Sequence, residues 1–155
     1  MSYVRAWIHA VWGTKRRENC LTKDARRTVI LHIEKNAKKK GIYIDRLNGG
    51  LDHLHCLIGL NADLSIAKTM QLLKGESAFW VNEQKIIQSR FEWADEYYAV
   101  SVSESDLAAV RAYIDKQEEH HRHKSFAEEV DVFCQRLPTR RSGLKPLLSH
   151  QLSPP

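Results

Sequence analysis

The stretch LDHLHCLI, residues 51–58, decides the fold. It is a short apolar run that follows the turn signal Asn48-Gly49-Gly50, and this pattern predicts a strand. On a strand, the side chains at positions i and i+2 point to the same face, about 6.5–7 Å apart. His53 and His55 are therefore expected to project together from one side, while Leu54 and Cys56 face a core on the other.

Strands and helices are expected on both sides of this stretch. They are a strand over 3–12, a helix over 22–40, strands over 42–47 and 51–60, a helix over 65–73 with a less regular helical continuation to 81, a strand over 97–102, a helix over 105–123 and a short helix over 125–134. This order predicts an α+β fold, the ferredoxin-like (RRM-like) split βαβ sandwich, with an antiparallel sheet and an added C-terminal helix that carries Tyr113. Residues 1–136 are expected to form one domain. Residues 137–155 hold all four prolines and several basic residues, and are expected to be a flexible tail.

The composition of the 155-residue chain is that of an ordinary globular protein, with 43% hydrophobic and 28% charged residues. No apolar run approaches the roughly 18 residues that a membrane helix needs, so no membrane association is expected. The three cysteines are far apart and form no CxxC pair. Reduced thiols in a cytoplasmic protein fit this spacing better than a disulfide framework does.

The positive charge is concentrated at one end of the chain. Residues 1–50 hold 12 Lys and Arg against 4 Asp and Glu, whereas the remaining residues hold 12 against 15. A cationic segment of this kind is typical of a surface that contacts nucleic-acid phosphates, and equally of a solvated basic helix face.

The two histidines suggest a metal site. Two imidazoles that converge from one strand can bind a single divalent ion, each through one ring nitrogen. Asp52 is less well placed as a ligand because it shares the face of Leu54. The pair alone is also compatible with two half-buried histidines with satisfied hydrogen bonds, so a third ligand and a chemical partner are needed elsewhere.

The helix expected over 105–123 can supply both. Tyr113 and Gln117 are four residues apart, so they lie one above the other along a helix. A phenol has a pKa of ~10 and is a poor nucleophile at neutral pH, but it can attack a phosphodiester that a divalent ion polarises. Two imidazoles and an amide add no negative charge to such an ion. Taken singly, Tyr113 is also typical of a core edge, Gln117 of a solvent-facing helix position, and His120, His121 and His123 of solvated side chains.

The ordered set of these motifs resembles the small single-tyrosine HUH transposases of the insertion-sequence 200/605 type (IS200-like transposases). The resemblance covers residues 3–133. It is carried by Val11-Trp12-Gly13-Thr14-Lys15-Arg16-Arg17, His53-Leu54-His55, Leu73-Lys74-Gly75 and Tyr113-Ile114-Asp115-Lys116-Gln117 followed by His120-His121. Two positions depart from the family pattern: Lys116 stands where many relatives have Asn, and Gly13 where Arg is common.

The resemblance implies a metal-dependent tyrosine transposase that nicks and rejoins single-stranded DNA at insertion-sequence ends through a 5′-phosphotyrosine intermediate. It implies Tyr113 as the nucleophile, His53, His55 and Gln117 as ligands of Mg²⁺ or Mn²⁺, and His120 and His121 as accessory residues. It also implies a bacterial or archaeal cell, subterminal DNA hairpins as partners, and a homodimer in which the tyrosine helix of one subunit can complete the metal site of the other. The candidate contacts to the DNA backbone are Lys15, Arg16, Arg17, Lys35, Lys38, Lys39 and Lys40.

Two other functions are compatible with the same residues. One is a catalytically silent module that binds hairpin DNA or RNA through the open sheet face and the basic helix, with His53 and His55 as structural groups. The other is a zinc- or transition-metal-binding protein that uses His53, His55 and His121. A covalent protein–DNA adduct distinguishes the enzyme from both.

Overall fold

The computed structural model describes residues 2–117 and 128. The elements follow in the order β1 (Trp7–Gly13), η1 (Lys15–Arg17), α1 (Lys23–Lys39), β2 (Tyr43–Gly49), β3 (His53–Gly59), α2 (Ile66–Glu83), β4 (Tyr98–Val102), η2 (Glu104–Asp106) and α3 (Leu107–Asp115), where η marks a short 3₁₀ turn. In this described part, no helix is both long enough and apolar enough to cross a membrane. The helix expected over 125–134, His120, His121 and the boundary at 136 lie outside the described residues.

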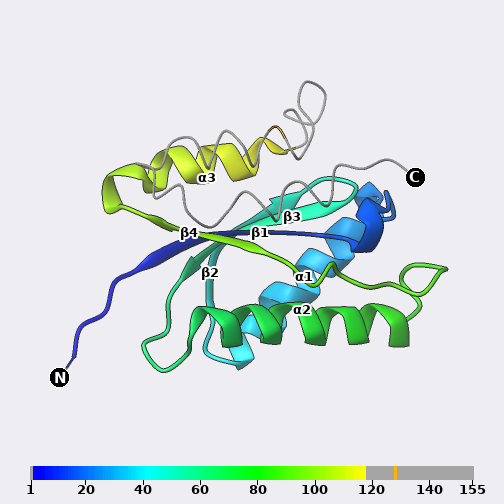
Figure 1. The fold of residues 1–155 in the computed structure, drawn as a ribbon, viewed down its shortest axis with the longest axis horizontal. Helices are drawn as coiled ribbons and strands as arrows, with labels where there is room; N and C mark the ends of the chain where they lie inside the picture. The colour runs from blue at the N-terminus through cyan, green and yellow to red at the C-terminus, as the bar shows by residue number, and fades with distance from the viewer. Residues whose placement is uncertain (1, 118–127, 129–155) are drawn as a thin grey trace. The chain divides into compact units, whose positions relative to one another are not determined.

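The four strands form one sheet in the order β2-β3-β1-β4. Each neighbouring pair is antiparallel. A strand order in which β1 lies between β3 and β4 is that of the split βαβ unit, so the predicted ferredoxin-like fold is confirmed. Helices α1 and α2 lie on one side of the sheet and α3 on the other (Figure 1).

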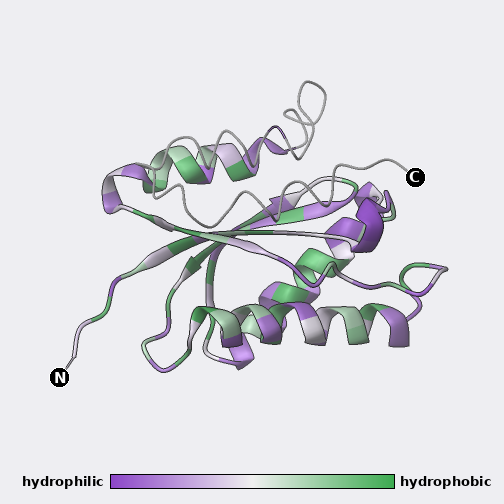
Figure 2. Ribbon diagram, in the orientation of Figure 1, coloured by the Kyte–Doolittle hydropathy of each residue, from purple (hydrophilic) through white to green (hydrophobic). Residues whose placement is uncertain are grey.

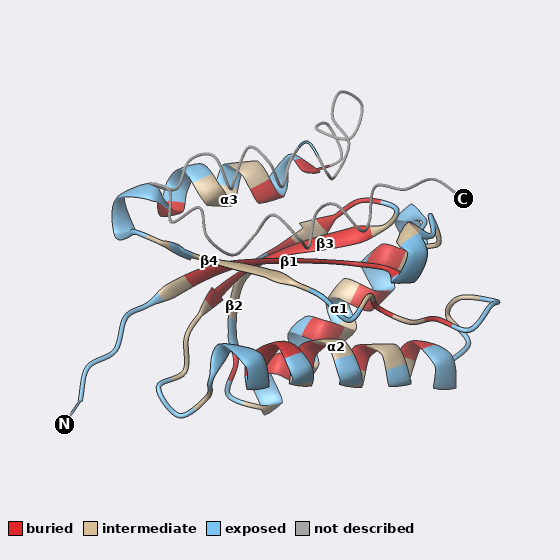
Figure 3. Cartoon of the chain, in the orientation of Figure 1, coloured by how far each residue is buried: buried red, intermediate tan, exposed pale blue. Residues whose placement is uncertain are grey.

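The main hydrophobic core lies between the sheet and the pair α1–α2. Alternate residues of β1 and β3 contribute to it, and the buried helix residues complete it: Ile8, Ala10, Trp12, Leu54, Cys56 and Ile58 from the strands, and Val29, Ile33, Ala37, Met70, Leu73 and Val81 from the helices. β1 and β3 are buried along most of their length because they are the two central strands (Figure 3). A smaller cluster lies on the other face, where Leu107 and Ile114 of α3 pack near Leu57.

Several of the predicted element bounds were wrong: β2 extends to Gly49 rather than 47, and α3 begins at Leu107 rather than at 105. β1 begins at Trp7 rather than at Tyr3, and both Tyr3 and Val4 are exposed. α2 is one continuous helix to Glu83 rather than a helix to Leu73 with a looser continuation. It continues because Ser77 and Val81 extend the buried stripe of Leu73, and apolar and polar residues alternate around the helix along its whole length (Figure 2).

The segment Asn48-Gly49-Gly50 is not a simple turn. Asn48 and Gly49 are the last two residues of β2 and pair with His55 and Leu54. Gly49 is required because an added Cβ would lie 2.1 Å from the His53 carbonyl oxygen and 2.8 Å from Leu54 Cα. The close approach of the two strands therefore depends on glycine at this position.

β2 contains a bulge at Asp45. The pairing register shifts between Ile44 and Arg46, so Asp45 is the extra residue on its strand. A bulge re-aims the side chain of the inserted residue. Here the Asp45 side chain becomes almost fully buried, with 6% of its area exposed, and it meets Arg111 of α3.

Candidate active site on the α3 face of the sheet

His53 and His55 lie side by side on β3, as the spacing predicts. Both residues are fully buried, and their ring centroids are 5.1 Å apart at an angle of 74°. They occupy the face of the sheet opposite the main core, because Leu54 and Cys56 take the core side. Burial also raises the pKa of the Cys56 thiol, so this cysteine is a packing residue rather than a nucleophile.

A carboxylate holds the first of the two rings. Asp52 Oδ1 lies 2.7 Å from His53 Nδ1, and Arg17 donates to Asp52 Oδ2 from Nη2 at 2.7 Å. Burial alone would raise the pKa of Asp52, but the hydrogen bonds from His53 and Arg17 outweigh burial and lower that pKa to about 2. Asp52 is therefore an ionised acceptor at neutral pH, which places the His53 proton on Nδ1 and leaves Nε2 as the nitrogen that could bind a metal ion.

The turn after β1 brings Arg17 to Asp52. Arg16 and Arg17 both have a φ of 57°, a left-handed conformation that is uncommon for residues with a side chain. Thr14 stabilises the turn, since its N–H donates to the Asp52 carbonyl at 2.8 Å and its hydroxyl donates to the Glu18 carbonyl at 2.8 Å. The strained backbone is thus compensated by hydrogen bonds that tie the turn to the start of β3.

A third histidine, His9 of β1, contacts the second ring. His9 Nε2 lies 2.9 Å from His55 Nδ1, and the two ring centroids are 5.2 Å apart. His9 is 1% exposed. Each histidine of the predicted pair is therefore approached at Nδ1 by another buried or half-buried polar group, His53 by Asp52 and His55 by His9.

Tyr113 reaches the same face from α3 of the same chain. Its ring centroid lies 5.6 Å from that of His55 and 6.3 Å from that of His9, both edge-on. Gln117, one turn further, is fully buried and donates from Nε2 to the Tyr113 carbonyl at 3.4 Å. Gln117 is therefore not a solvent-facing helix residue. A buried amide normally makes hydrogen bonds with polar partners.

Side chains of β2 hold α3 on the sheet. Arg111 makes a bidentate ion pair with Asp45, with both nitrogen–oxygen distances 2.8 Å. Asn48 Nδ2 donates to the Ile114 carbonyl at 3.0 Å, near the end of α3 where backbone carbonyls lack helical partners. The hydrogen bonds from Arg111 are the main cause that lowers the pKa of Asp45.

The donors on this face fit a divalent ion of the kind that imidazole and amide ligands bind. Within residues 2–117 and 128, no group of three His, Cys, Asp or Glu side chains is arranged to hold a metal. The third protein ligand that the resemblance implies for a site here is the amide of Gln117, which is fully buried. The Nδ1 contacts of both histidines match the second layer that usually orients metal-binding imidazoles.

The predicted DNA contacts lie in two separate places. Lys15 and Arg17 are near the histidine end of β1, where Gly13 pairs with His53, and both are in ion pairs, Lys15 with Glu92 and Arg17 with Asp52. Arg16 is exposed in the same turn. The other predicted contacts lie at the end of α1, just before β2 begins: Lys35, Lys38, Lys39 and Lys40. The start of β2 pairs with Gly59, at the end of β3 opposite His53. The six residue steps from His53 to Gly59 span about 20 Å along the strand.

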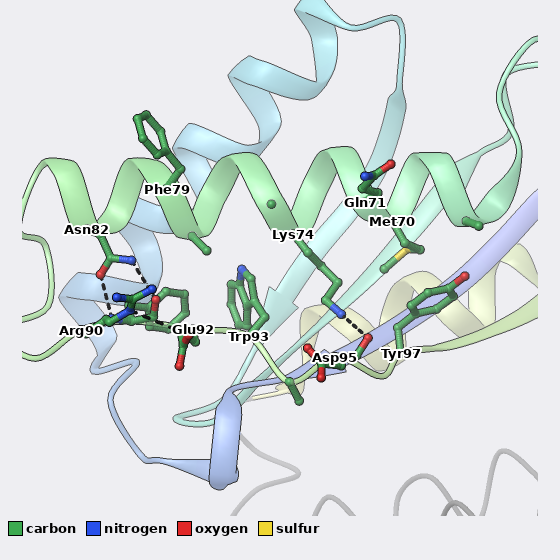
Figure 4. Close-up of a pocket in the computed structure, with 15 residues that line it drawn as sticks. Met70, Gln71, Lys74, Phe79, Asn82, Arg90, Glu92, Trp93, Asp95 and Tyr97 are labelled. Carbon is green, nitrogen blue, oxygen red and sulfur yellow. Dashed lines mark hydrogen bonds and ion pairs between the residues drawn. The ribbon is translucent and has the colours of Figure 1, made fainter.

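A hollow of about 580 Å³ lies away from the histidines, between α2 and residues 90–97 (Figure 4). Lys74 crosses it, with Nζ donating to the Asp95 carbonyl at 2.9 Å and lying 5.7 Å from the centre of the Tyr97 ring. Burial lowers the pKa of Lys74. Lys74 thus ties the segment before β4 to α2, which gives the Leu73-Lys74-Gly75 motif a structural role.

His9, Asp52 and Arg111 were not among the predicted site residues. His9 could have been found, because antiparallel pairing of its strand with the histidine strand puts alternate residues of both on one face. Asp52 was set aside as a ligand, but its position next to His53 allows it to contact Nδ1 instead. No local signal identifies the pair Arg111–Asp45, since it depends on the bulge in β2.

The fold and the site together define a ferredoxin-like protein with paired histidines beneath a tyrosine-bearing helix, which is the arrangement that the resemblance implied for a tyrosine transposase. The chain belongs to the IS200-like transposase family, whose model, described as "Transposase IS200 like", matches residues 2–117.

Two solved structures share the fold. A protein described as a candidate transposase of Deinococcus radiodurans R1 is 24% identical, with a TM-score of 0.61 over 76% of this chain and 95% of its own. A REP-associated tyrosine transposase bound to a REP hairpin is 15% identical, with a TM-score of 0.59 over 78% of this chain and 72% of its own. No curated protein matches the sequence.

Proposed function

We propose that this protein nicks and rejoins single-stranded DNA at insertion-sequence ends, with Tyr113 as the nucleophile and His53, His55 and Gln117 as ligands of Mg²⁺ or Mn²⁺. The observation that carries the proposal is the position of the Tyr113 ring, 5.6 Å from the His55 ring. This position supports the proposal, because a tyrosine-bearing helix lies over the buried histidine pair that carries the candidate ligands.

The reaction exchanges one phosphodiester for another. The Tyr113 oxygen loses its proton and bonds to phosphorus, and the 3′ oxygen of the cleaved strand leaves and takes up a proton, which yields a 5′-phosphotyrosine and a free 3′-hydroxyl. In the reverse direction a 3′-hydroxyl attacks the phosphotyrosine and releases the phenol. The bond energy is conserved in the tyrosine ester, so no nucleotide cofactor is required.

The protein groups have separate tasks in this scheme. A bound divalent ion would supply Lewis acidity and would hold the scissile phosphate in line with its attacking oxygen. His53, His55 and Gln117 are neutral as ligands, so they leave the charge of the ion undiminished. Arg111 and Asn48 fix α3 on β2 and so set where the phenol lies.

DNA is the proposed partner. The family membership supports it, and the REP hairpin bound by the REP-associated relative is consistent with hairpin recognition by this chain as well. Arg16 is exposed beside Arg17, which pairs with Asp52 next to His53, so Arg16 is the candidate contact to the strand near the cleaved bond. Lys35, Lys38, Lys39 and Lys40 are at the opposite end of the sheet and would contact a distant part of the DNA, such as a hairpin stem.

A homodimer is part of the same proposal. α3 contacts the sheet of its own chain through the Asp45–Arg111 pair and Asn48. If two subunits exchanged their α3 helices, the partner's helix could make the same contacts. These contacts depend on the side chains of α3 and β2 and not on the segment that joins β4 to α3. Exchange of this kind would complete each site in trans.

The test is a covalent-adduct assay. Single-stranded oligonucleotides that span the ends of the element are incubated with the protein and Mn²⁺ or Mg²⁺, and adducts that resist denaturation are counted on gels. The wild type should form adducts that EDTA prevents, and Tyr113→Phe should form none while it binds hairpin DNA as before. An adduct in Tyr113→Phe rules out this tyrosine, and tight binding with no adduct in the wild type favours a silent binding module.

A further inference from the structure

We infer that His9 is a positioning residue for the proposed metal centre: it accepts the Nδ1–H of His55 and thereby holds His55 in the tautomer whose Nε2 can bind the ion. The role of His9 in metal binding rests on the proposed function. The hydrogen bond itself is a property of the protein without metal, so it can be tested separately.

The geometry brings the two rings together without access to solvent. His9 Nε2 and His55 Nδ1 are 2.9 Å apart, an ordinary hydrogen-bond distance. His9 is 1% exposed and His55 is fully buried. The strand register explains the contact, because His9 pairs with Leu57 and the diagonal neighbour of that pair on the same face is His55.

A neutral imidazole has one N–H and one acceptor nitrogen, so only two arrangements of this contact are possible. If His55 donates from Nδ1, its Nε2 carries a lone pair and can bind a metal ion. If His9 donates instead, the His55 proton lies on Nε2, and that nitrogen cannot be a ligand. A metal site that uses His55 Nε2 therefore requires His9 to be the acceptor, with its own proton on Nδ1.

The two histidines of the centre differ in how their tautomers are set. The partner of His53 is the Asp52 carboxylate, whose other oxygen receives two hydrogen bonds from Arg17. The partner of His55 is another imidazole, which can donate or accept. The Nδ1 of His53 thus faces a carboxylate oxygen, whereas the tautomer of His55 depends on which of the two imidazoles donates.

His9 also touches the nucleophile. The His9 ring lies edge-on to the Tyr113 ring, with centroids 6.3 Å apart and an angle of 68°. One buried side chain therefore contacts both a proposed ligand and the proposed nucleophile. Replacing it with an apolar residue should disturb the ligand through the lost acceptor, and an amide of similar reach should preserve the acceptor.

The experiment compares His9→Leu with His9→Gln. The amide oxygen of glutamine can accept a hydrogen bond near the position of imidazole Nε2, whereas leucine keeps much of the volume and cannot accept. Mn²⁺ affinity is measured by titration calorimetry, with the thermal unfolding of each metal-free variant as a check of the fold. We expect His9→Leu to bind Mn²⁺ about 10- to 100-fold more weakly than the wild type, as for other second-layer partners, and His9→Gln to remain within a few-fold.

A second measurement uses the wild type alone. Long-range ¹H–¹⁵N correlation spectra of metal-free protein labelled at histidine report which nitrogen of each ring carries the proton. Protons on Nδ1 of both His9 and His55 support the inference. A proton on His55 Nε2, or unchanged Mn²⁺ affinity in folded His9→Leu, overturns it.

His55→Ala separates this inference from the proposed function. If the wild type binds Mn²⁺ and His55→Ala does not, the metal centre stands, and the His9 variants then decide the role of His9. If neither protein binds Mn²⁺, the metal centre itself is wrong, whatever the spectra show for the tautomers.

Discussion

Arg17 donates two hydrogen bonds to one carboxylate oxygen of Asp52, from Nε at 3.0 Å and from Nη2 at 2.7 Å. The other oxygen of that carboxylate lies 2.7 Å from Nδ1 of His53. A chain of charge-assisted hydrogen bonds thus runs from the turn after β1 to a buried histidine of β3. Arg17 stands in a basic cluster that suggests a DNA contact, yet its position makes it a support for the candidate metal centre.

Asp52→Asn is expected to weaken metal binding more than it weakens the fold. The amide keeps the size of the side chain, but it removes the charge that holds the His53 proton on Nδ1. Loss of a second-layer carboxylate lowers metal affinity by about 10- to 100-fold in comparable sites. Mn²⁺ titration calorimetry measures the change, and Asp63→Asn, at an exposed carboxylate, is the matched control. Equal affinities in wild type and Asp52→Asn would contradict the role given to Asp52.

Arg111→Met is expected to destabilise the protein by about 1–3 kcal/mol, because it leaves the nearly buried Asp45 carboxylate without its bidentate partner. Methionine keeps the aliphatic part of the side chain, so the loss reports the ion pair rather than packing. Urea unfolding measures the free energy of unfolding. Arg27→Met, at an exposed position of α1, should stay within about 0.5 kcal/mol of the wild type. An equal loss of unfolding free energy in both variants would contradict a stabilising role for the Asp45–Arg111 ion pair.

The stabilising effect of the Asp45–Arg111 pair should depend on pH. Hydrogen bonds from Arg111 lower the pKa of Asp45 in the folded state, so the unfolded state binds the proton more readily and stability rises with pH. The contribution is fully present above the unfolded carboxyl pKa of ~3.9 and is lost as the pH falls through the lower folded value. A double-mutant cycle with Asp45→Asn and Arg111→Met, followed by urea unfolding, should give a coupling energy at pH 7 that shrinks by pH 3. A coupling energy that is the same at both pH values would exclude an ion pair as its source.

Two glycine-to-alanine variants should change stability in opposite directions. At Gly49 an added Cβ would lie 2.1 Å from the His53 carbonyl oxygen, so β2 or β3 must shift, at a cost of about 1–3 kcal/mol. At Gly75, an exposed position inside α2, an added Cβ has nothing within 4 Å. Alanine there should stabilise the protein by about 0.5–1 kcal/mol, because it limits the freedom of the unfolded chain. Thermal unfolding of both variants measures the two shifts, and a stable Gly49→Ala would mean that the two strands are less closely apposed than described.

Periodicity was sufficient to predict the sheet and its two faces. The alternation in 51–58 separates His53 and His55 from Leu54 and Cys56, and burial of the apolar pair in the main core confirms that separation. The strand order also follows from the order of elements, since few connections are compatible with a split βαβ unit.

Contacts between distant residues could not be predicted in the same way. The Asn48-Gly49 pair is typical of a turn, and only the close approach of Leu54 shows why glycine is needed inside the strand. Arg17 and Asp52 are far apart in sequence, and their pairing depends on a left-handed turn that no local pattern indicates. To predict that His9 belongs to the site, one must know that its strand, β1, pairs with the strand that carries His53 and His55.

The alternation along the two central strands also predicts how mutations will be tolerated. In β1 and β3, the even-numbered residues Ile8, Ala10, Leu54 and Cys56 belong to the main core, while the odd-numbered residues His9, His53 and His55 lie beneath α3. In a complete mutational scan of these strands, substitutions at even-numbered and odd-numbered positions should therefore have different effects. Substitutions at even positions would lower the amount of folded protein in cells, and those at odd positions would lower transposition per folded molecule.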